Sequence, residues 1–120
     1  MKKTETEEQK VIFQWAYMQK GKYPELNLLF AIPNGGYRHP LEAKNLKLQG
    51  VKAGVPDIFL PVARGGYYGL WIELKVGKNK TTENQDIWIE SLRKQNYRVE
   101  VCYGANIAIE LILNYLKSKA

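Results

Sequence analysis

The chain has 120 residues, of which 45% are hydrophobic and 25% are charged, as is usual for one domain of a soluble globular protein. The formal net charge of +6 favours a polyanionic partner, nucleic acid first. The one cysteine, Cys102, excludes an internal disulfide and fits a reducing cytoplasmic setting, and the sequence contains no signal peptide and no apolar run of membrane-spanning length.

The first predicted element is a helix over residues 4–20, which Thr4 can cap. Glutamates in its first turn suit the positive end of the helix dipole. Four apolar residues recur at helical spacing and predict its core-facing side: Val11, Ile12, Trp15 and Met18. Glu8 precedes three of them by three, four and seven residues, so we expect it to project from the same face.

A short strand and a second helix follow. The apolar run over residues 28–32 predicts the strand, and the turn sequence PNGG ends it. Residues 40–49 predict the helix, with Pro40 in its first turn and Gly50 after its end. No linker or repeat divides the chain, so we expect one domain over residues 1–120.

Two apolar runs, over residues 57–62 and 67–76, flank the turn sequence ARGG and predict a hairpin. Alternate side chains of a strand share one face, so Glu73 and Lys75 lie together on one side of the second run. Folding the hairpin back brings Asp57 toward Glu73, and the register of the pairing decides how near the two acids come.

A third helix is predicted over residues 82–95, where Thr82 and Gln85 have capping-box spacing. Its expected inner face holds Ile87, Trp88, Ser91 and Leu92. A strand over residues 97–103 and a closing helix over residues 106–119 complete the chain. The order α, β, α, β, β, α, β, α predicts an α/β domain with a mixed central β-sheet flanked by helices.

Two carboxylates that converge at the end of buried strands repel each other and lose solvation. Protonation of one acid, an ion pair with Lys75 or a divalent cation would each relieve this cost, and Mg²⁺ or Mn²⁺ prefers such hard oxygen ligands. Glu8 could add a third carboxylate, which would leave Lys75 to orient or deprotonate a water or to stabilise charge on a phosphate. A surface ion pair is the ordinary interpretation of Glu-x-Lys, but apolar neighbours make it harder to sustain here.

The sequence PD at residues 56–57, followed after 15 residues by ELK at 73–75, resembles the PD-(D/E)XK nuclease signature. Further segments in family order, over nearly the whole chain, resemble the VRR-NUC family in its stand-alone phage or bacterial type: residues 7–16, 32–36, 46–61, 69–75 and Gln85. The resemblance implies a PD-(D/E)XK (restriction-endonuclease-like) core. It also implies metal-dependent hydrolysis of phosphodiester bonds in DNA, with Mg²⁺ or Mn²⁺ as cofactor.

The resemblance also implies roles for individual residues. Asp57 and Glu73 match the metal-binding acids of the family, and Lys75 matches its catalytic lysine. The backbone carbonyl of Leu74 would be a further metal ligand. Gln85 matches the family's glutamine on the helix after the hairpin, a role that is compatible with the capping box.

The family's N-terminal metal-binding glutamate falls in the sequence TETEEQ. Glu8 is preferred because it shares the apolar face of the helix, with Glu5 and Glu7 as alternatives. Polar and basic residues around the site are candidate contacts to the DNA backbone, although lysines of this kind also simply solubilise surfaces: Asn34, Tyr37, Arg38, Lys44, Lys47, Lys52, Lys78 and Lys80. Tyr67, Tyr68 and Trp71 could stack on bases, but hairpin packing is their simpler interpretation.

These implications favour a structure-specific, Holliday-junction-resolvase-like endonuclease that acts as a homodimer in the cytoplasm of a bacterial or phage-infected cell. A two-fold dimer presents two active sites to a junction that needs two symmetric cuts. The alternatives are a non-catalytic nucleic-acid-binding module, a flap or single-strand nuclease of the same fold, a restriction-type nuclease, and an interaction protein whose hairpin acids are surface residues.

Overall fold

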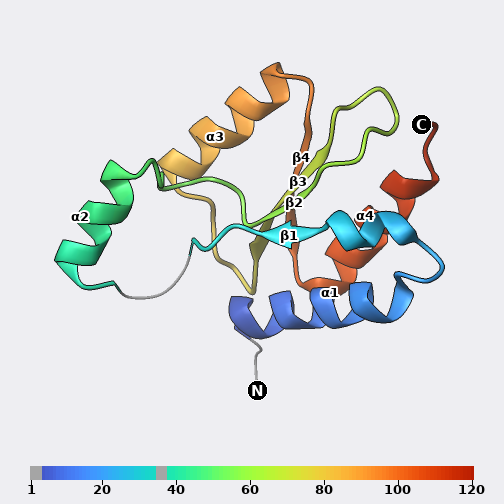
Figure 1. The fold of residues 1–120 in the computed structure, drawn as a ribbon, viewed down its shortest axis with the longest axis horizontal. Coiled ribbons are helices and arrows are strands. Elements are labelled where there is room, and N and C mark those ends of the chain that lie inside the picture. Colours follow the sequence, from blue (N-terminus) through green and yellow to red (C-terminus); the bar gives the residue numbers. More distant parts are fainter. Residues whose placement is uncertain (1–3, 35–37) are drawn as a thin grey trace.

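The computed structural model of the chain describes residues 4–34 and 38–120, in which four strands form one sheet (Figure 1). The strands are Phe30–Ala31 (β1), Ile58–Leu60 (β2), Leu70–Lys75 (β3) and Arg98–Tyr103 (β4). Their order across the sheet is β1-β2-β3-β4; the first two pairings are antiparallel, and β3 pairs with β4 in parallel. The mixed sheet expected from the sequence is therefore confirmed.

Four α-helices accompany the sheet within the described residues: Glu5–Gln19 (α1), Pro40–Leu48 (α2), Glu83–Lys94 (α3) and Ala105–Lys117 (α4). Helices α1 and α4 contact each other and β3, α3 contacts β4, and α2 stands apart at the left of Figure 1. A 3-10 helix, Pro24–Leu28 (η1), follows α1. None of the described helices combines the length and the apolar character needed to cross a membrane.

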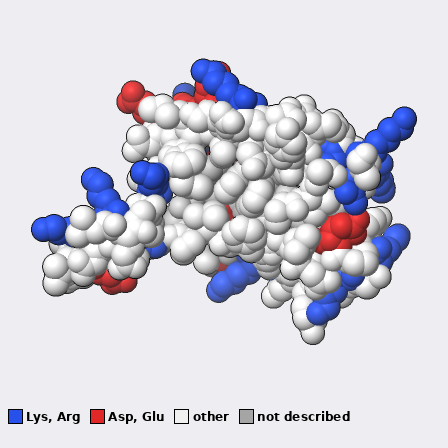
Figure 2. Space-filling model, turned by 45° about the horizontal axis from the view of Figure 1, so that its top comes forward, with Lys and Arg blue, Asp and Glu red and all other residues white. Residues whose placement is uncertain are grey.

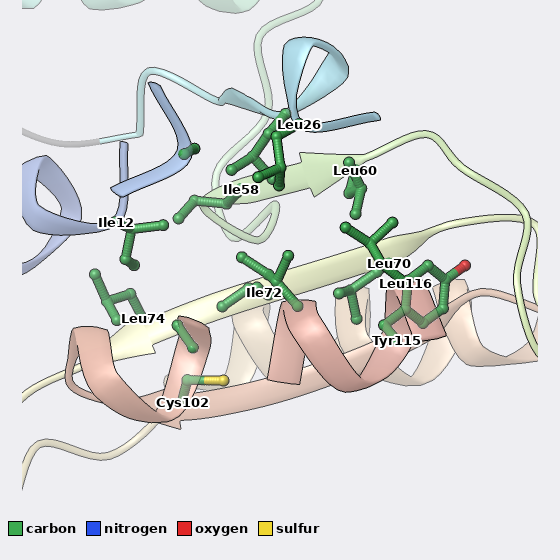
Figure 3. Close-up of a cluster of buried hydrophobic side chains, with 14 of the residues drawn as sticks. Ile12, Leu26, Ile58, Leu60, Leu70, Ile72, Leu74, Cys102, Tyr115 and Leu116 are labelled. Atoms are coloured by element: carbon green, nitrogen blue, oxygen red, sulfur yellow. The ribbon is translucent and has the colours of Figure 1, made fainter. Parts of the chain in front are cut away.

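The hydrophobic core fills the space between the sheet, α1 and α4 (Figure 3). Ile12 of α1 and Tyr115 of α4 meet the even-numbered residues of β3, such as Ile72, and all three are almost fully buried. The Tyr115 hydroxyl donates a hydrogen bond of 2.6 Å to the carbonyl of Val62, which satisfies its polar end inside the core. The odd-numbered residues of β3 consequently face the other side of the sheet, toward α3.

The helix caps expected from the sequence are present. The Thr4 hydroxyl accepts from the amide of Glu7 at 3.1 Å, and Thr82 and Gln85 form a complete capping box at the start of α3. Asn96, with a φ of 71°, takes the left-handed conformation after α3. Local hydrogen-bonding chemistry thus defines where these helices begin and end.

Two expected helix faces are wrong in part. Met18 is 78% exposed, and Ala16 is buried in its place because α1 turns its last residues away from the core. On α3, Ile89 is buried and Trp88 is half-buried, whereas Ile87 is 56% exposed. The inner stripe of α3 follows helical spacing from Gln85, so residues 87 and 91 fall on the solvent side.

The strand expected over residues 28–32 is much shorter in the structure. Leu28 closes the 3-10 helix and Leu29 is buried beneath it, so only Phe30 and Ala31 pair with β2. The hydrogen bonds within the 3-10 turn use main-chain groups that an extended strand would offer to its neighbour.

Gly54 provides a test of how closely the segment before β2 approaches α3. Its φ is +93°, and a Cβ there would lie 2.8 Å from the carbonyl carbon of Asn84. Gly50 has a similar φ of +99° with open space around it. We expect Gly54→Ala to lower the free energy of unfolding by about 3 kcal/mol, from strain and overlap, and Gly50→Ala by about 1 kcal/mol, from strain alone. Urea denaturation measures both, and equal losses would contradict the role of the close approach.

Candidate active site

Two carboxyl groups meet where the hairpin strands β2 and β3 separate. Ile58 pairs with Ile72, so continuing the antiparallel register by one step sets Asp57 opposite Glu73. The Asp57 carboxylate accepts a hydrogen bond of 2.8 Å from the amide of Leu74, which takes the place of the missing ladder bond. The structure therefore brings together the two acids that the hairpin pattern predicts to be near each other.

The position of Asp57 is held from the side of β1. Its carbonyl accepts from the amide of Ile32 at 2.7 Å. The Asn34 side-chain amide donates to the carbonyl of Val55 and, at 3.4 Å, to the Asp57 carboxylate. The segment after β1 thus supplies a polar side chain that orients the acid, although the sequence suggested Asn34 only as a DNA contact.

Glu73 is 1% exposed, and its carboxyl group carries most of the electrostatic cost of the site. The pKa of Glu73 is raised from 4.5 to about 9, above all by burial and then by a hydrogen bond with Asp57 and by the charges of Asp57 and Glu5, while Lys75 opposes the shift. Lys75, itself 7% exposed, places its Nζ 3.9 Å from Glu73 Oε2. The Gln85 side-chain amide donates to the same oxygen at 3.3 Å, so Gln85 contacts Glu73 and completes the capping box at once.

The donor set fits a divalent cation. Glu73 Oε1 is buried and finds no hydrogen-bond donor among the described residues, so the ionised carboxylate leaves one oxygen unsatisfied. A cation, or a proton shared with Asp57, would satisfy it. The main chain of Leu74 faces Asp57, so the Leu74 carbonyl would add an oxygen of the type that Mg²⁺ and Mn²⁺ accept as a ligand. No three Asp, Glu, His or Cys side chains within residues 4–34 and 38–120 cluster tightly enough to form a closed metal site.

The first helix brings Glu5, rather than Glu8, toward this pair. Glu5 lines a hollow of about 530 Å³ together with Asp57 and Leu74, and its carboxylate accepts from the Asn79 side chain at 3.2 Å. Gln9 and Phe13 line the same hollow, so the face of α1 that meets the acids repeats every four residues from Glu5.

Glu8 and Glu7 have other surroundings. The Glu8 carboxylate accepts from the amide of Ala105 at 3.4 Å, at the start of α4, where Gly104 has no side chain to act as a cap. Glu7 is exposed and accepts from the Thr4 hydroxyl at 3.3 Å. The geometry therefore favours Glu5 as the N-terminal acid of the site, which the sequence left open as an alternative to Glu8.

The residues suggested as DNA contacts divide into groups. Arg38, Lys47 and Lys52 line a second hollow, between α2 and α3, together with Asn34 and Gln85. The remaining lysines of the suggested set are exposed outside that hollow: Lys44, Lys78 and Lys80. Tyr37 lies outside the described residues.

The aromatic residues of the hairpin pack against one another. Trp71 stacks on Phe59 with ring centroids 4.1 Å apart, and Tyr97 meets both rings edge-on. Tyr68 in turn contacts Tyr97 at 6.2 Å. Hairpin packing, the simpler interpretation of the hairpin aromatics, agrees with this arrangement for Trp71 and Tyr68.

The raised pKa of Glu73 predicts a pH dependence of stability in the metal-free protein. Between pH 4.5 and about 9 the folded state holds a proton on Glu73 that the unfolded chain has lost, so the free energy of unfolding falls as the pH rises. The neutral variant Glu73→Gln removes this contribution. We expect the free energy of unfolding of Glu73→Gln, relative to that of the parent, to increase by about 1.4 kcal/mol per pH unit from pH 5 to pH 8.

Urea denaturation in EDTA measures this difference. Glu110→Gln, an exposed substitution on α4 with the same loss of charge, is the matched control and should show no such trend. A constant difference between parent and Glu73→Gln over this pH range would contradict the assigned protonation.

Comparison with known proteins agrees with the fold. The family model described as VRR-NUC domain matches residues 3–106. A solved structure described as "VRR_NUC domain protein" has a TM-score of 0.84 and 37% sequence identity, covering 98% of this chain and 91% of that one. No curated protein matches. The mixed sheet and its helices are consistent with the predicted PD-(D/E)XK (restriction-endonuclease-like) core. The chain therefore belongs to the VRR-NUC family, a family of nuclease type.

Proposed function

We propose that this chain is a divalent-metal-dependent endonuclease that hydrolyses phosphodiester bonds in branched DNA. The observation that carries the proposal is the pairing of buried Glu73 with half-buried Asp57, with one Glu73 oxygen lacking a donor among the described residues and with Lys75 beside it. Such an arrangement is costly for a protein that uses it only for structure.

In this proposal the carboxylates of Asp57 and Glu73 and the carbonyl of Leu74 would hold the cation directly, and Glu5 would reach it through a bound water. Bound there, a Mg²⁺ or Mn²⁺ ion would offset the charge of the acids and polarise the phosphate. Lys75 donates hydrogen bonds to the attacking water or to a phosphate oxygen and stabilises the charge that develops during the attack. Buried at 7% exposure, its ammonium acts where water screens it little.

Gln85 and Asn34 act as positioning residues. Gln85 holds Glu73 Oε2 from α3, and Asn34 holds the Asp57 carboxylate from the end of β1. The two acids are thus oriented from opposite sides by amide side chains. An amide donor orients a carboxylate without adding a second charge to the site.

Four-way junctions are the first DNA structure to test. The proposed site contains one set of acids per chain, so two symmetric cuts would need two copies, as in a homodimer. The net charge of +6 supports DNA as the partner. A non-catalytic nucleic-acid-binding module is the second candidate, and it would share the charge but not need the buried acids.

Loss of the proposed catalytic groups should abolish cleavage. We expect Lys75→Ala and Asp57→Asn to lower the rate on the preferred substrate by at least about a hundredfold in Mg²⁺ or Mn²⁺. Lys94→Ala, an exposed lysine in the last turn of α3, is the control and should retain the parent rate. Labelled junction, flap, single strand and plain duplex are compared, each also in EDTA.

The substrate series separates the alternatives. Symmetric metal-dependent cuts in the junction would support a resolvase-like enzyme, and cuts in flaps or single strands would keep the chemistry but replace the junction. If the parent binds DNA and cleaves none of the four, the binding module takes the place of the nuclease. Equal cleavage by parent and Lys75→Ala would remove Lys75 from the mechanism.

Mn²⁺ binding gives a readout that does not depend on activity. Because a ligand that binds only the folded state stabilises it, Mn²⁺ at a hundred times its dissociation constant should stabilise the parent by about 2.7 kcal/mol. Glu5→Gln should weaken this effect and Glu8→Gln should leave it intact, since Glu8 lies at the start of α4 instead. Thermal melts with and without Mn²⁺ make the comparison, and the reverse order would assign the N-terminal ligand to Glu8.

A further inference from the structure

A cleft of about 700 Å³ separates α2 from α3, a volume typical of ligand sites. Its walls come from α2, the segment before β2 and the first two turns of α3. Helix α2 buries none of its side chains, and Figure 2 shows it as a lobe at the left with Lys and Arg side chains on its surface. Helix α2 does not pack closely against α3, so the space between the two helices stays open.

The charge of the cleft is of one sign. Arg38, Lys47 and Lys52 line it, and no Asp or Glu does so among the described residues. Lys47 and Lys52 form no ion pair within the part of the chain that the structure describes, and Arg38 donates to a neutral carbonyl, that of Pro33, at 2.6 Å. Uncompensated cations on α2, beside it and on the segment before β2 favour a polyanion in the cleft.

The cleft borders the acid pair. Gln85 lines it and donates to Glu73, and Asn34 lines it and donates to Asp57. Phosphates lying in the cleft are therefore separated from the acids by one layer of side chains.

Trp88 adds a surface of different chemistry to the same walls. Its indole is half-buried on α3 and lines the cleft one helical turn after Gln85. In proteins that bind single strands, aromatic side chains stack on the bases while cations follow the backbone. Bases are free for such stacking only where they are unpaired, and a cleft of this volume is too small to enclose a duplex.

We propose that the cleft between α2 and α3 binds an unpaired DNA strand beside the bond to be cut, with Lys47 and Lys52 on its phosphates and Trp88 against a base. The occupied cleft would also give α2 the packing partner that it lacks. This inference rests on the proposed function, which places the bond to be cut beside the acids. It restricts the proposed substrate to branched DNA that carries unpaired nucleotides.

Strand binding in EDTA tests the cleft without cleavage. Fluorescence anisotropy compares a labelled twelve-nucleotide thymidine strand with a blunt duplex of the same length. We expect Lys47→Gln with Lys52→Gln to weaken strand binding at least about tenfold and to reduce the slope of log affinity against log salt by about 0.7 per lysine. The control pair, Lys94→Gln with Lys119→Gln, removes equal charge from exposed positions outside the cleft and should bind within twofold of the parent.

The base contact has its own readouts. An abasic strand should bind the parent at least about fivefold more weakly than the thymidine strand, and Trp88→Leu should erase this difference. Trp88→Phe keeps an aromatic side chain and so controls for loss of the fold. Strand binding should change the tryptophan fluorescence of the parent and of Trp15→Phe, but it should not change that of Trp88→Phe. A signal that persists in Trp88→Phe would overturn the contact.

The outcomes separate this inference from the proposed function. Unchanged affinity in the Lys47 and Lys52 pair overturns the cleft, even if the parent cleaves DNA and Asp57→Asn does not. Equal binding of duplex and strand overturns the preference for unpaired nucleotides. If binding depends on the cleft but the parent cleaves no substrate, the binding site stands and the nuclease falls.

Discussion

The meeting of two carboxyl groups at the end of one hairpin, one of them fully buried, is the constraint on which the rest of the structure depends. Asp57 and Glu73 are set opposite each other by the register of β2 and β3, and side-chain amides from the segment after β1 and from α3 hold them. Desolvation makes the pair unfavourable as a dianion, so the surroundings must supply a proton, a cation or Lys75.

The surroundings of the acids are asymmetric. Pro33 and Asn34 border both hollows, the cationic cleft on the α3 side and the smaller one that Glu5 lines on the α1 side. The cleft is lined by cations and by no acid among the described residues, whereas the smaller hollow is lined by Glu5 and Asp57 together with Lys10. In the proposed function the first would hold phosphates and the second would face the cation.

Sequence signals predicted this arrangement unevenly. Capping chemistry is local, so Thr82 and Gln85 could be identified as a capping box, and alternation along β3 correctly grouped its charged residues on one face. The inner face of a helix depends on where the helix docks, which spacing alone does not specify. Met18 was therefore misassigned, and Glu8 was preferred over Glu5 because it shares the stripe that meets α4 rather than the stripe that meets the acids. The four-residue repeat that begins at Glu5 was a sequence signal for the other face of α1. Choosing between the two faces requires knowing where the sheet lies against the helix.

The isolation of α2 has a consequence for how such a domain diversifies. Because none of its side chains is buried, exchanging this helix for another would cost little folding free energy, while the acids remain held by β2, β3 and α3. Selection, or an engineer, can therefore alter what enters the cleft independently of the chemistry beside it. The helix is therefore the natural site for grafting a new recognition element onto an otherwise unchanged domain.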